Sequence, residues 1–206
     1  MSWAKTAGLL VVLAAGAVAS FGRTDDPKAI DEEGFVKEWL LLAPIPLAGG
    51  EDAAAAVDKQ QLPDEAKLEP KDGEKVTVGG AELAWKKYAA KEHYIDFNDF
   101  LGKQTEQSVG YAVTYVVSDG EVKDAVLKIG SDDQCKDYLN GKEVGKVTEA
   151  RALEKDQNSY EGLTLKKGSN TLVFKVINEG GDWSGCARFT DKDGKPVKGL
   201  KVEFKK

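Results

Sequence analysis

Apolar and polar residues alternate with a period of two over much of the chain from residue 74 onward. This period puts every second side chain on the same face of an extended strand, so it predicts strands with one buried face. The clearest stretch is Tyr111–Val117, which is rich in β-branched and aromatic residues. Predicted strands follow one another at the spacing of an antiparallel β-sandwich, at 75–78, 82–87, 94–97, 111–117, 125–129, 135–139, 162–165, 170–178, 186–190 and 197–204.

The turns between these segments contain the residues that tight hairpins need. Asn140-Gly141 is a strong two-residue hairpin signal, because both turn positions adopt positive φ. Asp191-Lys-Asp-Gly194 is also read as a hairpin, since a helix-flanked calcium loop needs Glu six residues after the glycine and this chain has Leu200 there. The predicted fold class is therefore mostly β, a jelly-roll-like antiparallel β-sandwich with a short helix and an N-terminal arm.

The chain before residue 74 is less regular. Phe35–Pro46 (FVKEWLLLAPIP) is the first apolar block after the N-terminus and predicts a buried strand that ends at its prolines. Ala53–Leu62 is rich in alanine and predicts a short helix. Pro63 and Pro70 then mark a charged loop.

The N-terminus has the pattern of a secretory signal peptide. Lys5 precedes an apolar run of 13 residues at 7–19, which ends in the small-x-small sequence Ala17-Val18-Ala19. The run is shorter than the roughly 20 apolar residues that span a bilayer, although retention as an anchor remains the alternative. We therefore expect a signal peptide over 1–19, a flexible arm over 20–34, one domain over 35–206, and a secreted or periplasmic protein.

Charge narrows the class of partner. The formal net charge is −6, with acidic and basic residues well mixed along the chain. An acidic balance disfavours nucleic acids and anionic membrane surfaces. We expect no nucleic-acid partner, no membrane insertion of the mature chain, and a glycan or a cell-envelope protein as the candidate partner.

Two cysteines, Cys135 and Cys186, are the only ones in the chain. In an exported protein an even number of cysteines indicates a disulfide, and we predict that the two join neighbouring strands at one end of the sandwich. The alternative is a pair of small buried apolar side chains.

No sequence pattern indicates catalysis. His93 is the only histidine, and it lies in a polar segment without a nucleophile motif around it, so a structural role is favoured. The ligand spacing of zinc sites and the glycine patterns of phosphate-binding loops are both missing. The prediction is a non-enzymatic protein that requires no cofactor.

The corner Gly130-Ser131-Asp132-Asp133 is the best candidate for ligand chemistry. Two adjacent carboxylates on a sharp corner can face one calcium ion, which takes several oxygen ligands, or accept hydrogen bonds from sugar hydroxyls. Asp132 and Asp133 are therefore the predicted ligand-binding pair and the candidate calcium ligands. The alternative, favoured on the sequence alone, is that Ser and Asp close the turn through their own backbone.

Trp183 follows Gly180, Gly181 and Asp182 on a second corner. An exposed aromatic ring there can stack on the apolar face of a sugar, so Trp183 is the third predicted ligand-binding residue. The alternative places the ring in the core at one end of the sandwich.

The chain resembles the galactose-binding-like β-sandwich modules of large secreted bacterial proteins. The resemblance covers about residues 35–204 and rests on four stretches: Trp39-Leu40 with Pro44 and Pro46, residues 130–142, residues 165–172, and residues 178–194. It implies the sandwich fold and a role in carbohydrate binding, spacing or docking. It does not define the ligand, because this fold hosts many functions.

A narrower likeness is to the protective-antigen-like lectin domains of flocculin-type adhesins. In those domains an Asp-Asp pair holds calcium, which in turn holds sugar hydroxyls, and only Asp132 and Asp133 match that pair here. The expected function is a secreted, non-catalytic carbohydrate-binding-type module. The alternative is a structural or protein-interaction β-sandwich of the cell envelope without a sugar site.

Overall fold

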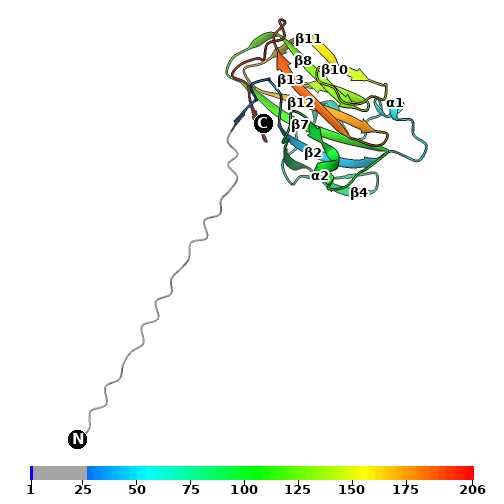
Figure 1. Ribbon diagram of the computed structural model, residues 1–206. Coiled ribbons are helices and arrows are strands. Elements are labelled where there is room, and N and C mark those ends of the chain that lie inside the picture. Colours follow the sequence, from blue (N-terminus) through cyan, green and yellow to red (C-terminus); the bar gives the residue numbers. More distant parts are fainter. Residues whose placement is uncertain (2–26) are drawn as a thin grey trace.

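A computed structural model describes Met1 and residues 27–206 of the chain. The predicted signal peptide, apart from Met1, and the first part of the predicted arm lie outside the described residues. The rest forms two facing antiparallel sheets and a short separate hairpin (Figure 1). The predicted fold class, a jelly-roll-like antiparallel β-sandwich, is confirmed.

The larger sheet has eight strands. They are β1 (Lys28–Ala29), β2 (Glu38–Pro46), β5 (Lys86–Ala89), β7 (Ser108–Ser118), β9 (Cys135–Leu139), β10 (Lys142–Val147), β12 (Gly168–Asn178) and β14 (Lys201–Glu203). Their order is β1-β14-β7-β12-β9-β10, and β2 pairs with both β5 and β7. At the free edge, the pairing of β10 with β9 shifts register between Glu143 and Gly145.

The smaller sheet has the order β11-β8-β13-β6. Its strands are β6 (Ile95–Asp96), β8 (Val122–Asp132), β11 (Asn158–Leu165) and β13 (Ser184–Thr190). A two-stranded hairpin, a 3₁₀ turn and two short helices complete the fold: β3 (Lys75–Val78), β4 (Ala81–Ala84), η1 (Glu65–Lys67), α1 (Ala53–Ala56) and α2 (Phe97–Leu101). No helix of the described part is long and apolar enough to cross a membrane.

Strands β7 and β12 form the centre of the larger sheet and pair without interruption over eleven residues. Alternate side chains of β7 point to opposite faces, so Ala112 and Val116 face the core between the sheets, while Tyr111 and Tyr115 face outward. Both faces are covered, because nearly every residue of β7 is buried. The sheet therefore has a core on each side.

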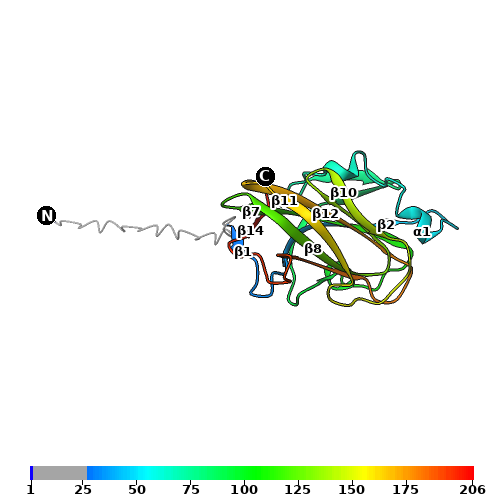
Figure 2. The same cartoon turned by 90° about the horizontal axis from the view of Figure 1, so that it is seen from above.

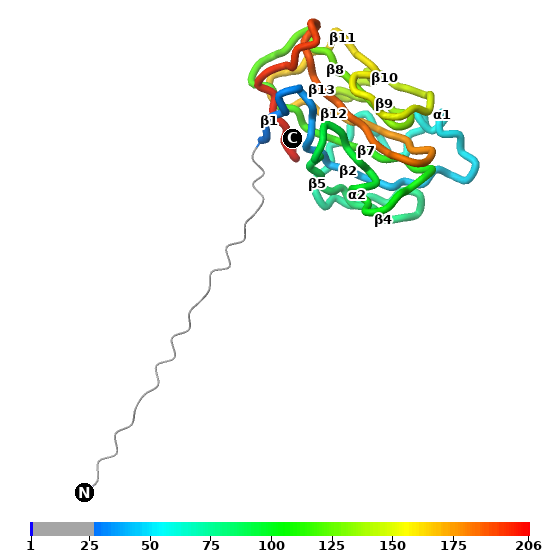
Figure 3. Tube along the Cα trace, in the orientation of Figure 1, coloured from blue at the N-terminus to red at the C-terminus, as the bar shows by residue number. Residues whose placement is uncertain are grey.

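The second core is covered by the irregular chain between β2 and β5. Here Val57, Leu62 and Trp85 pack on the outward residues of the larger sheet. Figure 3 shows α1 close to the β9–β10 hairpin, where Lys136 Nζ lies 2.7 Å from Asp58 Oδ1. The predicted helix over 53–62 is only partly present, because α1 ends at Ala56 and turns follow.

The described part of the predicted arm is attached to the sandwich. Lys28 and Ala29 pair with Val202 and Lys201 of β14, near the C-terminus (Figure 2). Asp31 Oδ1 then accepts a hydrogen bond of 2.8 Å from the backbone N–H of Phe35. Main-chain and side-chain hydrogen bonds therefore fix the chain from residue 28 to the first buried strand.

The predicted disulfide is wrong, because Cys135 and Cys186 are both free, buried thiols. Cys135 begins β9 in the larger sheet, whereas Cys186 lies in β13 of the smaller sheet, opposite Gly130. The two cysteines thus belong to different sheets and not to neighbouring strands. Burial raises the pKa of the Cys186 thiol to about 11.

Candidate functional site

The two carboxylates of the acidic corner point in different directions. The peptide bond between Asp132 and Asp133 is cis. Asp133 is 9 % exposed, and its carboxylate accepts hydrogen bonds from the backbone N–H groups of Glu179 (2.9 Å) and Arg151 (3.2 Å). Asp133 therefore has a structural role, but its carboxylate ties the corner to two other segments of the chain and does not close the turn through its own backbone.

Asp132 instead faces a surface cavity of about 480 Å³. Desolvation raises the pKa of its carboxyl to about 6, with further contributions from the negative charges of Asp133 and Asp182. The backbone N–H of Leu153 acts in the opposite direction. Asp132 is therefore a partly buried acid with excess negative charge around it.

The register of the smaller sheet explains what lies beside Asp132. Asp132 is directly opposite Ser184 of β13, and Ser184 is directly opposite Asp96 of β6. Residues paired in this way point to the same face of a sheet, so the three side chains form a row across β8, β13 and β6. This row is the floor of the cavity.

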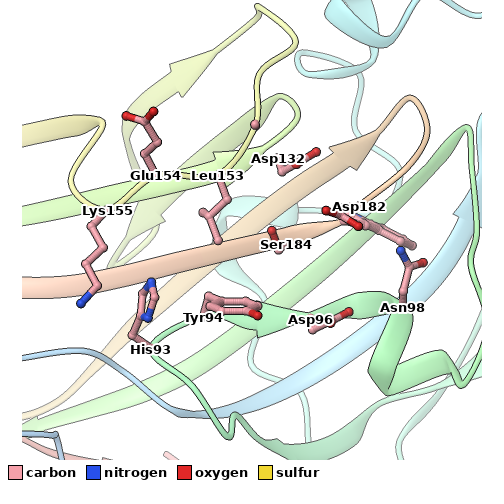
Figure 4. Close-up of a pocket in the computed structure, with 12 residues that line it drawn as sticks. His93, Tyr94, Asp96, Asn98, Asp132, Leu153, Glu154, Lys155, Asp182 and Ser184 are labelled. Carbon is pink, nitrogen blue, oxygen red and sulfur yellow. The ribbon is translucent and has the colours of Figure 1, made fainter.

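Two corners and one loop form the walls (Figure 4). Asn98 and Asp182 lie at one end of the cavity, and His93 and Lys155 lie at the other. The complete lining is His93, Tyr94, Asp96, Asn98, Asp132, Ala152, Leu153, Glu154, Lys155, Asp182, Trp183 and Ser184. Four of these residues are acidic and one is a lysine, so the lining carries a net negative charge. The positive charge of Lys155 is already paired, because its Nζ lies 2.9 Å from Glu33 Oε2.

The loop at 151–155 is held in place by Arg151. Its guanidinium donates to Ser131 Oγ at 2.9 Å and to Asn158 Oδ1 at 2.7 Å. Ser131 Oγ in turn donates to the carbonyl of Asp133 at 2.7 Å. The wall of the cavity and the acidic corner are thus parts of one hydrogen-bonded network.

Helix α2 positions the opposite wall. Asp96 caps it by accepting a 2.8 Å hydrogen bond from the N–H of Asp99, and Gly102 ends it with φ +66°. Asn98 accepts from the N–H of Thr105 at 3.0 Å and donates to the carbonyl of Gly181 at 3.1 Å. Asn98 therefore holds the glycine corner that carries Asp182.

Trp183 is not the exposed platform that the sequence predicted. It is 1 % exposed and stacks on Phe97, with ring centroids 4.7 Å apart. Gly110 of β7 leaves space for both rings, since a β-carbon there would lie 2.7 Å from Phe97 and 2.8 Å from Trp183. Tyr94, which is half-buried, supplies the accessible aromatic side chain in the cavity.

His93 also lines the cavity, although the sequence favoured a purely structural role. Its ring packs against Phe35 and Tyr94, with centroids 5.1 and 5.2 Å away. Burial, followed by the charge of Lys155, lowers its pKa. The ring is therefore neutral at pH 7, and its aromatic contacts fix it as part of the wall.

Of the three predicted ligand-binding residues, the structure thus places Asp132 in the cavity with its carboxylate accessible. The residues that sequence reasoning missed are Tyr94, Asp96, Asn98 and Asp182. The sequence Asp96-Phe-Asn-Asp99 before Gly102 has the signals of a capped helix, and these could have located α2. Nothing in the sequence indicates that β6 lies beside β13.

Comparisons with known proteins show only distant likeness. No family model and no curated protein matches the chain. Among solved structures, the PA14 domain of the antifreeze protein MpAFP matches with a TM-score of 0.39 and 11% identity, over 88% of this chain and 94% of that one. A GH31 alpha-xylosidase from Xanthomonas citri matches with a TM-score of 0.29 and 13% identity, over 84% of this chain and 19% of that one.

Proposed function

We propose that the chain is a secreted, non-catalytic carbohydrate-binding-type module that binds sugar in the cavity beside Asp132. The observation that carries this proposal is the row of Asp132, Ser184 and Asp96 on the floor of a cavity of about 480 Å³. A cavity of this size suits a small ligand, and a few convergent polar groups fix its orientation. Carboxylate oxygens accept hydrogen bonds from sugar hydroxyls, and the ring of Tyr94 offers an apolar face.

Calcium is a candidate component of this site. The carboxylates of Asp132 and Asp182 face one cavity, and their mutual repulsion is relieved by a cation. Asp133 does not contribute, because its carboxylate is bound by two backbone N–H groups. Within residues 27–206 no three acidic, histidine or cysteine side chains are grouped closely enough to hold a metal. A calcium ion here would take its other oxygen ligands from water or from sugar hydroxyls.

The test is a glycan array on the purified protein, followed by calorimetric titration of a hit with and without calcium. The variants Asp132→Asn and Asp182→Asn should each weaken binding at least tenfold and leave the thermal midpoint almost unchanged. Asp193→Asn, an exposed acid on the turn before β14, is the matched control and should bind normally.

The outcomes separate the competing functions. No glycan bound with or without calcium would overturn the proposal and favour a structural or protein-interaction module of the cell envelope. Binding that survives both cavity variants would place the sugar elsewhere on the protein. If the protein cleaves a bound glycan, and the variant Asp132→Asn no longer does so, the non-catalytic part of the proposal is contradicted.

A further inference from the structure

A second cavity, of about 490 Å³, lies at the opposite end of β9 from the acidic corner. The β9–β10 hairpin contributes Asn140, Gly141 and Lys142 to its lining. The rest comes from the β11–β12 hairpin, from η1 and the residues after it, and from the C-terminus: Lys166, Ser169, Thr171, Ala66, Lys67, Glu69 and Lys206. It shares no residue with the cavity beside Asp132.

The charge of this second cavity is opposite to that of the first. Four lysines line it, against the single acid Glu69. Lys206 forms an ion pair with Glu69. Lys67, Lys142 and Lys166 have no ion-pair partner within residues 27–206, and all three are exposed. Three ammonium groups without counter-ions on one cavity attract an anion.

Two hydroxyl groups in the lining lack partners. Thr171 is 5 % exposed, and its Oγ1 forms no hydrogen bond with any described residue. The hydroxyl oxygen of Ser169 is also buried, and it forms no hydrogen bond with any described residue. Residues 169 and 171 point to the same face of β12 as Val173, which belongs to the second core. Both hydroxyls therefore lie at the end of that core, where a bound ligand can supply the missing hydrogen bonds.

The frame around these groups is fixed before any ligand binds. Asn140 Oδ1 accepts from the N–H of Thr171 at 3.1 Å, and its Nδ2 donates to Asn170 Oδ1 at 2.9 Å. Asn170 also accepts from the N–H of Lys166 at 2.8 Å. These bonds join the two hairpins, so Lys142 and Lys166 project from a rigid base.

An adjoining hollow of about 360 Å³ shares Asn140, Lys142 and Lys166 with this cavity. It continues along Leu139, Val144, Gly162, Leu163 and Thr164 between the edge strands of the two sheets. The two hollows together have room for more than one sugar ring, and their mixture of apolar and hydroxyl groups suits a saccharide.

We propose that this second cavity, named here the lysine cavity, binds an acidic oligosaccharide. A carboxylate or sulfate group of one sugar would lie between Lys142, Lys166 and Lys67. The hydroxyls of Ser169 and Thr171 would pair with hydroxyls of the same ring. The proposal does not depend on the site beside Asp132, because the two cavities have no residue in common.

The experiment titrates the full chain by calorimetry with glucuronate, glucose 6-sulfate, glucose and inorganic sulfate in low-salt buffer. The first two compounds distinguish a carboxylate from a sulfate source. At least one of them should bind ten times more tightly than glucose, and its affinity should fall as salt is added. Lys142→Gln with Lys166→Gln should reduce that affinity at least tenfold.

Two further variants keep the result interpretable. Lys192→Gln makes the same kind of charge change on an exposed turn outside the cavity and should bind normally. Thr171→Val keeps the shape of the side chain, should leave the protein at least as stable, and should weaken the sugar but not inorganic sulfate.

Equal affinity for glucose and both acidic sugars would overturn the proposal, as would full affinity in the double lysine variant. Binding of inorganic sulfate without either acidic sugar would show a bare anion site and would contradict the saccharide part.

Discussion

Lys175 Nζ lies 3.3 Å from Glu65 Oε2, and the two side chains are 0 % and 1 % exposed. Glu65 also accepts hydrogen bonds from the hydroxyls of Tyr111 (2.5 Å) and Tyr138 (2.6 Å). Lys175 donates further to the carbonyls of Lys59 and Val57. A buried ion pair thus joins β12 to the segment that covers the outer face of the larger sheet.

The first prediction concerns this pair. Lys175→Met leaves the carboxylate of Glu65 buried without its cation, so it should lower the free energy of unfolding by roughly 3–5 kcal/mol. Urea denaturation measures the change. Lys175→Met combined with Glu65→Gln should be less destabilised than Lys175→Met alone. Equal or greater loss in the double variant would contradict a specific role for the ion pair.

The second prediction concerns Asp137, whose side chain is fully buried. Desolvation raises the pKa of its carboxyl to about 8, so it is mainly protonated in the folded protein at pH 7 and ionised in the unfolded chain. The folded state therefore holds the extra proton, and stability falls as pH rises from about 4 to 8. Between pH 6 and 7.5, Asp137→Asn should remove a negative slope of up to about 1.4 kcal/mol per pH unit. Identical slopes in the two proteins would refute this.

The third prediction distinguishes the two aspartates of the corner. Asp133→Ala removes the acceptor for the N–H groups of Arg151 and Glu179, so it should destabilise the protein by about 1–3 kcal/mol. Asp132→Ala removes the acceptor for one such group, the N–H of Leu153, from a less buried side chain, so it should destabilise the protein less, by about 1 kcal/mol or below. Thermal unfolding of both variants is the measurement, and the opposite order would reverse the assigned roles.

The fourth prediction follows from the pKa of Asp132, which is raised to about 6. A ligand that needs the carboxylate, such as calcium or a sugar hydroxyl donor, should bind well at pH 7.5 and weaken as pH falls through 6. The affinity of Asp132→Asn should be low and should not change over the same range. A wild-type affinity that is constant from pH 5 to 7.5 would exclude Asp132 as the titrating group.

The fifth prediction is that both cysteines are thiols. Thiol titration in denaturant without reductant should find two per chain, and titration of the native protein should find almost none, because both are buried. Fewer than two thiols in the denatured protein would mean that a disulfide forms despite the arrangement described here.

The strands were predictable because their alternation reflects a physical period of two. Tyr111–Val117 lies within β7, and Asn140-Gly141 forms the expected hairpin with φ of +52° and +80°. The helix at Phe97 was missed because Tyr94–Phe97 has the β-branched and aromatic composition of a strand. Asp96 caps that helix instead.

The site was less predictable than the fold. Asp132 could be found because adjacent acids on a corner stand out in the sequence. Asp96 and Asp182 join it only through the pairing of β6, β13 and β8, which is a long-range property that composition does not encode. Trp183 was misjudged because the glycine that makes space for its ring, Gly110, lies in another strand.

The register shift at Gly145 has a consequence for how copies of this protein behave beside one another. Strand β10 is the open edge of the larger sheet, and a β-carbon at Gly145 would meet the ring of Tyr160 at 2.1 Å. An irregular edge that carries Lys142 and Lys146 and is overlain by an aromatic ring is a poor template for a strand of another molecule. This edge therefore disfavours the strand-to-strand pairing between copies by which fibrous aggregates grow.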